Sequence, residues 1–166
     1  MLVDEQYCRV EKQRVVLPNG SDTDWFIRHS DPAVVIIPQL KSGEIYLQKT
    51  YKHGCGKIVV EFPAGLVDSG EEPIKAAIRE LREETGLVAE EIVPLGKCSA
   101  DATGSRMTYY FFLAKNCEKV AELELDDSEQ IESMIVPDLE TVQKEFLHGE
   151  YETSASSLAA LTAVLF

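Results

Sequence analysis

The chain has 166 residues, a length typical of one domain. With 16 basic and 29 acidic residues its formal net charge is −13, which argues against a protein that binds nucleic acid through clustered lysines and arginines. Hydrophobic residues make up 45% and charged residues 27%, so the composition is that of a globular protein and not of a disordered tail or a membrane protein. The acidity is compatible either with a small anionic ligand balanced by a divalent cation or with solvated acidic surfaces.

We expect a cytoplasmic protein that does not associate with membranes. The first residues are charged, and the longest strongly apolar run, residues 33–38, is far shorter than the about 20 residues that span a bilayer. The four cysteines are scattered and form no CxxC pair, so we expect reduced thiols and no zinc site.

Along the chain, no repeat or linker divides residues 1–166, which predicts a single domain. Two strands flank the turn signal Pro18-Asn19-Gly20-Ser21 and predict an N-terminal β-hairpin. Periodicity predicts strands at residues 9–17, 24–29, 33–38, 44–50, 57–62, 92–99, 107–114 and 131–136, and helices at residues 73–85, 139–147 and 154–165. Strands mixed with a few helices predict an α+β fold or an α/β/α sandwich, with a mixed β-sheet between helices and the hairpin as an extension.

The helix at residues 73–85 has the clearest pattern. Pro73 suits a first helical turn, and Gly86 suits the position just past the end of the helix. Apolar residues at spacings of three and four predict an inward face that consists of Ile74, Ala77, Ile78 and Leu81.

Three acids of this helix, Glu80, Glu83 and Glu84, lie at positions i, i+3 and i+4 and so share one face. Like charges at this spacing repel, but a hard divalent cation among them would make the arrangement favourable. Oxygen ligands suit Mg²⁺ or Mn²⁺, and the backbone carbonyl of Ala64 could add another. The alternative is a solvated acidic face with salt bridges to nearby basic residues, Lys75, Arg79 and Arg82.

Residues 65–87 match the Nudix box, G-x5-E-x7-R-E-U-x-E-E-x-G-U with U apolar, at every fixed position. The chain therefore resembles the Nudix hydrolases. The resemblance implies an α/β/α sandwich whose box forms a loop–helix–loop, and an enzyme that uses Mg²⁺ or Mn²⁺ to cleave a diphosphate linked to another moiety. By position, it implies that the metal ligands are Glu80, Glu83, Glu84 and the Ala64 carbonyl, that Arg79 orients the glutamates, and that Glu71, Gly65 and Gly86 have supporting roles.

The resemblance extends to the branch of ADP-ribose pyrophosphatases. Residues 60–71 look like the E-[FL]-P-A-G-L-[IV]-D segment of that branch, and residues 17–20 and 148–161 are also similar. This implies hydrolysis of ADP-ribose to AMP plus a sugar phosphate, and a homodimer formed through N-terminal strands within residues 1–30.

One departure concerns residues 101–106, which contain a glycine but lack the proline that the branch usually has there. The departure keeps a GDP- or UDP-sugar pyrophosphatase open as an alternative. A Nudix module that senses a nucleotide without cleaving it is another, although retention of all three metal glutamates argues against it.

Four residues outside the box are further candidates. Trp25 would stack on the base of the substrate, or else fill the core. Lys52 lies where relatives have the arginine of a Q-[YF]-R pattern and would meet a phosphate. Arg106 would meet phosphate or ribose, or else be a solvated surface residue. Glu129, in the acidic stretch 126–132, is the preferred general base, the alternative being an ordinary acidic loop.

Overall fold

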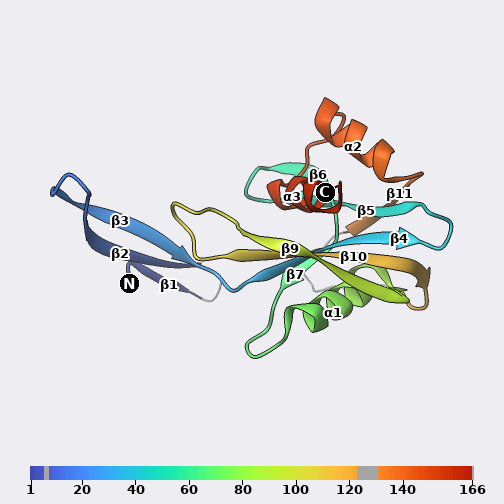
Figure 1. The fold of residues 1–166 in the computed structure, drawn as a ribbon, viewed down its shortest axis with the longest axis horizontal. Helices are drawn as coiled ribbons and strands as arrows, with labels where there is room; N and C mark the ends of the chain where they lie inside the picture. The colour runs from blue at the N-terminus through green and yellow to red at the C-terminus, as the bar shows by residue number, and fades with distance from the viewer. Residues whose placement is uncertain (6–7, 123–130, 166) are drawn as a thin grey trace.

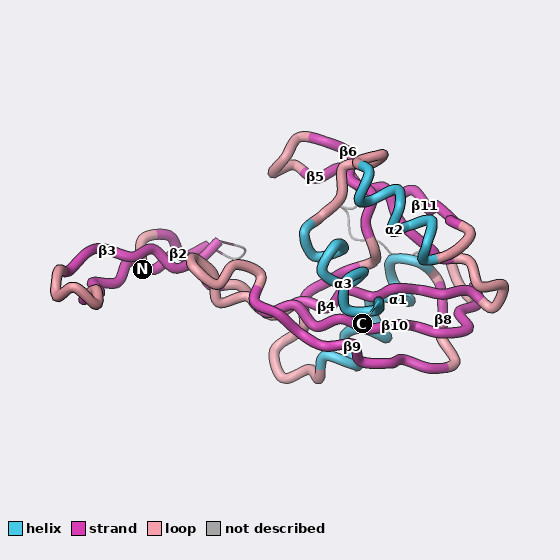
Figure 2. The backbone as a smooth tube through the Cα atoms, turned by 45° about the horizontal axis from the view of Figure 1, so that its top comes forward, coloured by secondary structure: helices cyan, strands magenta, loops and turns pink. Residues whose placement is uncertain are grey.

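The computed structural model describes residues 1–5, 8–122 and 131–165. Its first three strands are β1 (Val3–Glu5), β2 (Cys8–Val16) and β3 (Asp22–His29), which pair antiparallel in a separate sheet. This sheet, which we call the arm, stands away from the rest of the molecule (Figure 1, Figure 2). The predicted N-terminal hairpin is thus confirmed, and β1 adds a third strand to it.

The body contains a mixed sheet with the path β11-β5-β4-β10-β8. Among the described strands of this sheet, only β4 and β10 pair in parallel, while β6 pairs with β5, β7 with β4 and β9 with β10, all antiparallel. The strands of the body are β4 (Ala33–Leu40), β5 (Ile45–Lys52), β6 (Lys57–Glu61), β7 (Ala64–Leu66), β8 (Leu87–Val88), β9 (Glu91–Ser99), β10 (Thr108–Lys119) and β11 (Ile131–Val136).

Helices cover both faces of this sheet, α1 (Pro73–Thr85) on one side and α2 (Leu139–His148) with α3 (Ala155–Leu165) on the other (Figure 1). Strand β4 supplies both cores by alternation. Val34 and Ile36 belong to the cluster packed with α1, whereas Val35 and Ile37 belong to the cluster that includes residues of α2 and α3. A strand buried on both faces is expected to be continuously apolar, as β4 is. The predicted α/β/α layering is confirmed.

The sheet is splayed between β4 and β5, which pair only at Gln39 and Ile45. Beyond this point, β6 extends the β5 half of the sheet and β7 extends the β4 half. The chain crosses from one half to the other between these two strands, where the Pro63 carbonyl accepts a bond from the Ile36 amide. The first residues of the Nudix box therefore lie at the splayed part of the sheet.

Helix α1 has the predicted bounds, but its buried face differs from the prediction. Ile78 is 46% exposed, so its inward placement was wrong, whereas Ala77, Leu81 and Glu84 are buried. These three lie at i, i+4 and i+7 on one stripe, and Ile78 is about 100° further round the helix from Ala77. A glutamate of the box thus occupies the buried stripe of the helix.

Local signals explain where the helices begin and end. Gly86 has a left-handed conformation with φ of 69°, and its amide donates to the Arg82 carbonyl, which closes α1. Asp138 caps α2 by accepting a hydrogen bond from the Thr141 amide, and Ser154 accepts one from the Ser157 amide at the start of α3. In the described part of the chain, none of the helices has the length and apolar character needed to cross a membrane.

Candidate active site

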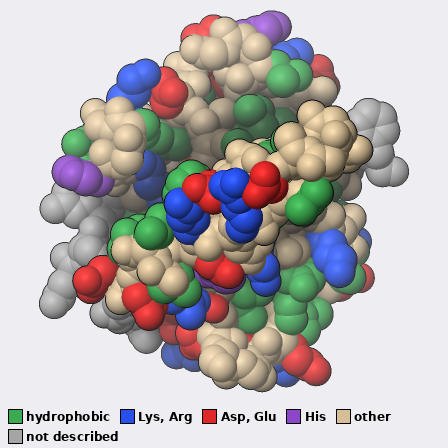
Figure 3. Space-filling model, turned by 90° about the vertical axis from the view of Figure 1, so that its left-hand side faces the viewer, with side chains coloured by type: hydrophobic (Ala, Val, Ile, Leu, Met, Phe, Trp, Pro, Cys, Tyr) green, Lys and Arg blue, Asp and Glu red, His purple; other side chains and the backbone are tan. Residues whose placement is uncertain are grey.

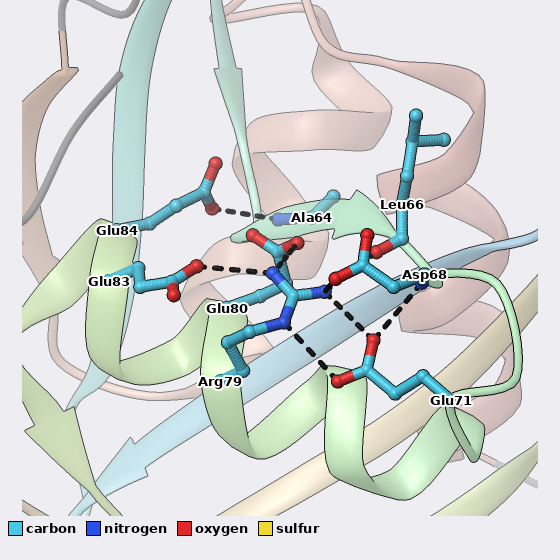
Figure 4. Close-up of polar contacts among 8 residues, drawn as sticks. All are labelled: Ala64, Leu66, Asp68, Glu71, Arg79, Glu80, Glu83 and Glu84. Atoms are coloured by element: carbon cyan, nitrogen blue, oxygen red, sulfur yellow. Dashed lines mark hydrogen bonds and ion pairs between the residues drawn. The ribbon is translucent and has the colours of Figure 1, made fainter.

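The carboxylate of Glu84 lies between the two halves of the splayed sheet. Its Oε2 accepts a hydrogen bond of 2.9 Å from the amide of Ala64 on β7 and one of 3.2 Å from Nε2 of Gln48 on β5 (Figure 4 shows the first). Glu84 is only 5% exposed. A buried carboxylate is stable only when hydrogen bonds or charges compensate it, and these two donors provide part of that compensation.

Arg79 holds the other carboxylates of the box (Figure 4). Its guanidinium donates to Glu71 through Nε and Nη2, at 3.2 and 3.0 Å, and through Nη1 to Glu80 at 2.6 Å and Glu83 at 3.1 Å. Nη2 also donates to the Leu66 carbonyl, so the loop before α1 is tied to the helix. Arg79 thereby offsets the repulsion among the glutamates, and the planar guanidinium suits several acceptors at once.

The charges of this network shift its pKa values in the expected directions. The hydrogen bond from Arg79 is the main cause that lowers the pKa of Glu71, and bonding to Glu71 is in turn the main cause that raises the pKa of Arg79. Both shifts favour the ionised forms, so the loop and the helix are joined by a full ion pair at neutral pH.

Gly65 allows the Glu80 carboxylate to lie directly against the backbone of β7. A Cβ atom at position 65 would overlap the carboxyl carbon and both oxygens of Glu80. The requirement for glycine therefore comes from this close approach and not from a left-handed backbone conformation.

The donor chemistry of the box fits a hard divalent cation. Within the described residues no three His, Cys, Asp or Glu side chains already converge on one point. The reason is visible in the network, since Arg79 holds Glu80 and Glu83. The glutamates nevertheless lie on adjacent turns and supply only oxygen donors. Glu80 lies against the backbone of Gly65, and the Glu84 side chain is hydrogen-bonded to the backbone of Ala64. Such a set suits Mg²⁺ or Mn²⁺ better than zinc.

Lys52 is linked to the residues around Glu84 by an ion pair with Glu61. The Lys52 ammonium, about half exposed, forms an ion pair with the buried carboxylate of Glu61. Glu61 lies opposite Gln48 in the β5–β6 register, so Lys52, Glu61, Gln48 and Glu84 form a polar series along one region of the sheet.

Trp25 and Arg106 both lie at a different place, the junction of the arm with the loop of residues 100–106. The Trp25 indole donates to the Thr103 carbonyl at 2.8 Å, and the Arg106 amide donates to the Arg28 carbonyl at 3.1 Å. Trp25 is half-buried on β3 and belongs to neither core cluster, so the core-filling alternative is not what the structure shows. The Arg106 side chain is exposed.

The predicted base, Glu129, lies outside the described residues, as do Asp126 and Asp127. Glu132 of the same acidic stretch is described. It pairs with Lys49 across β11 and β5, at 2.8 Å, and neighbours Ser133, which is in register with Gln48. Since successive strand residues point to opposite faces, Glu132 is on the face away from Gln48.

A cavity of about 550 Å³ lies between the arm and the box loop. Its lining includes the cations Arg9 and Arg28, His29, and residues of the box loop such as Asp68 and Ser69. Figure 3 views the molecule from the side of the arm and shows basic and acidic side chains gathered at the centre of that face. Ion pairs of the arm join Lys12 to Asp24 and Arg14 to Asp22.

Sequence reasoning missed Gln48, Glu61 and the cations of this cavity. The one available signal for Gln48 was a glutamine directly after the apolar residues 45–47, in a strand expected to be buried. The cavity cations lie on the two strands of the predicted hairpin, but their approach to the box loop depends on how the arm joins the body, which no local pattern shows.

Comparison with known proteins adds three findings. A family model described as "NUDIX domain" matches residues 29–156. The ADP-ribose pyrophosphatase of Bacillus subtilis (strain 168) is 32% identical over 123 residues, which are 74% of this chain and 66% of that protein. The ADP-sugar pyrophosphatase of Mus musculus is 32% identical over 101 residues, 54% of this chain and 46% of that protein. The chain thus spans less than two thirds of either relative.

Among solved structures, the crystal structure of an ADP compounds hydrolase superposes with a TM-score of 0.85 over 98% of this chain and 87% of that chain. The sequence identity is 24%, so this likeness establishes the fold.

Proposed function

We propose that this chain, which belongs to the Nudix family, is a pyrophosphatase that hydrolyses the diphosphate bond of a nucleoside diphosphate derivative with Mg²⁺ or Mn²⁺. The observation that best supports this is the complete box, in which Arg79, Gly65 and Ala64 hold the glutamates at the splayed part of the sheet. We further propose ADP-ribose as the preferred substrate, with AMP and a sugar phosphate as products.

In this proposal Glu80, Glu83 and Glu84 hold the metal, assisted by the Ala64 carbonyl. When bound, the metal polarises phosphoryl oxygens and makes water a better nucleophile. Water attacks one phosphorus, the bridging P–O bond breaks, and the leaving phosphate takes the electron pair. Glu129 accepts the proton of the attacking water.

Substrate contacts are proposed at two places. Lys52 would exchange its ion pair with Glu61 for a phosphate oxygen, as its half-exposed ammonium permits. Trp25 would stack on the base, and Arg106 would contact phosphate or ribose nearby. Arg9 and Arg28 line the cavity beside the box loop together with Asp31 and Asp68. Arg9 pairs with Asp31 at 3.6 Å, so it would reach a phosphate of the substrate only by exchanging this partner.

A nucleotide sugar is the second candidate substrate. The loop of residues 101–106 lacks the proline expected for the ADP-ribose branch, and it forms the contact with Trp25. If Trp25 stacks on the base, a loop without this proline would change the surroundings of the base and so the base that is accepted. The second candidate substrate is therefore a GDP- or UDP-sugar.

We also propose that the chain is a single domain that assembles as a homodimer through the arm, in the cytoplasm. Large apolar side chains are exposed on the arm, namely Met1, Leu2, Val3, Val16 and Phe26. An interface between two copies of the arm would remove these side chains from water. All four cysteines are free thiols, which is compatible with a reducing compartment.

A substrate screen tests the function. The purified chain is incubated with ADP-ribose, GDP-mannose, UDP-glucose, a dinucleoside polyphosphate or NADH, with Mg²⁺, with Mn²⁺ or with EDTA, and the products are identified by chromatography. We expect metal-dependent release of AMP from ADP-ribose. Turnover confined to a GDP- or UDP-sugar would favour the second candidate, and binding of a nucleotide without turnover would favour a sensor.

A further inference from the structure

One polar side chain outside the box reaches a box glutamate from the opposite half of the splayed sheet. Gln48 on β5 is 1% exposed, and its side-chain amide lies 3.2 Å from Oε2 of Glu84 on α1, 36 residues away in sequence. The same oxygen accepts the Ala64 amide. Glu84 belongs to α1, and its carboxylate is bonded to Ala64 of β7 and to Gln48 of β5.

The orientation of the Gln48 amide follows from chemistry. An ionised carboxylate only accepts hydrogen bonds, so the group that faces Glu84 must be the NH₂ and not the carbonyl. That orientation leaves Oε1 of Gln48 buried and, among the described residues, without a hydrogen-bond partner. A buried amide with one unsatisfied atom destabilises a fold. The hydrogen bond to Glu84 offsets this cost, and it ties the choice of glutamine at position 48 to that carboxylate.

We propose that Gln48 is a positioning residue that fixes the carboxylate of Glu84 and thereby sets the affinity of the site for its divalent cation. This inference rests on the proposed function, because it takes Glu84 to be a metal ligand. Residues that hydrogen-bond to metal ligands orient them, and their loss typically weakens metal binding by about 10- to 100-fold. Gln48 is the donor that comes from the β5 half, so it also keeps Glu84 in place relative to Lys52, four residues along the same strand.

The test uses the full chain and Mn²⁺ as the probe. Gln48→Met keeps the length and volume of the side chain but removes the donor. Thr50→Val is the matched control, because Thr50 is two residues along β5 on the same face and its buried hydroxyl has no hydrogen-bond partner among the described residues. Mn²⁺ binding is measured by the loss of the free-ion EPR signal and by calorimetry, and kcat is measured against Mn²⁺ concentration.

We expect the Mn²⁺ Kd of Gln48→Met to rise by about 10- to 100-fold, with that of Thr50→Val unchanged. At saturating Mn²⁺ the kcat of Gln48→Met should return to within about threefold of the wild-type value, because the ligands themselves remain. A merely structural role would lower the fraction of folded protein without moving Kd. A Kd within about twofold of wild type for Gln48→Met would overturn the proposal.

The same data separate this inference from the proposed function. If Mn²⁺ binds and Gln48→Met weakens it, but no diphosphate is hydrolysed, the positioning role stands and the enzymatic proposal fails. If Glu84→Gln binds Mn²⁺ as tightly as wild type, Glu84 is not a ligand and the positioning role of Gln48 is overturned, whereas the enzymatic proposal still depends on whether the wild-type chain hydrolyses a diphosphate.

Discussion

The carboxylate of Glu80 lies against the backbone of Gly65 so closely that a methyl group at position 65 would overlap it. Gly65 lies in strand β7 and Glu80 lies in helix α1, so their contact brings the strand and the helix together. Arg79, next to Glu80 in sequence, strengthens the same connection by donating to the Leu66 carbonyl. The close approach of the Glu80 side chain to the Gly65 backbone thus explains why the box has a glycine at position 65.

We predict that Gly65→Ala lowers metal-dependent turnover by at least about 10-fold, because Glu80 must leave its place to make room for the methyl group. Gly54→Ala is the control. A Cβ at Gly54 has no neighbour within 4 Å in the described structure, and that residue has no positive φ. Circular dichroism checks that both variants fold. Equal activity of Gly65→Ala and wild type would show that the Glu80 carboxylate does not need this place.

We predict that Asp138→Ala lowers Tm by about 2–4 °C at pH 7, because α2 loses its N-cap. The backbone hydrogen bond from Thr141 lowers the pKa of Asp138 below 3.8. The charged cap therefore contributes fully above the unfolded pKa of about 3.9, and this contribution is lost as the pH falls through the folded value. Calorimetry should show the Tm difference from wild type shrinking below pH 4. Asp138→Asn keeps a neutral cap, so its Tm difference from Asp138→Ala should not change with pH over this range.

We predict that Trp25→Ala raises KM by about 10-fold with a smaller effect on kcat, since stacking on a base is lost. Trp25→Phe should retain most of the affinity, because it keeps an aromatic face and loses only the bond to Thr103. Trp25 is the only tryptophan of the chain, so its fluorescence should also change when AMP binds to the wild-type protein. An unchanged KM in Trp25→Ala would place the base elsewhere.

We predict a homodimer, of twice the 18.5 kDa chain mass, in sedimentation equilibrium. Val16 and Phe26 are exposed on the same face of the arm, and changing both to serine should shift the equilibrium to monomer. Ile58→Ser, at an equally exposed apolar residue on β6, is the control and should leave the dimer intact. If the control alone dissociated the dimer, the interface would lie on the body and not on the arm.

The sequence predicted the parts of the fold that local chemistry determines. Helix α1 begins at Pro73 and ends before Gly86 as expected, because a proline starts a helix well and a glycine accepts the left-handed cap. Strands β1, β7 and β8 were missed because two or three residues are too few to show alternation. The ion pair between Arg79 and Glu83 follows from the helix period, since the two residues are one turn apart.

Long-range features could not be predicted. The outward placement of Ile78 and the burial of Glu84 depend on how α1 rotates against the sheet, which a helix period alone does not determine. The bond between Gln48 and Glu84 depends on the splay between β4 and β5. Arg9 and Arg28 line the same cavity as the box loop, and this depends on how the arm joins the body.

We propose above all that the glutamates of the box bind the divalent cation with which the protein hydrolyses a nucleoside diphosphate derivative. The most direct test of this proposal is ³¹P NMR of ADP-ribose incubated with Mg²⁺ and the wild-type chain, Glu83→Gln or Glu84→Gln. We predict that the wild type replaces the diphosphate signals with those of AMP and ribose 5-phosphate, and that both variants remain folded but are slower by at least about 100-fold. Cleavage by Glu83→Gln and Glu84→Gln at the wild-type rate would contradict the proposed role of these glutamates.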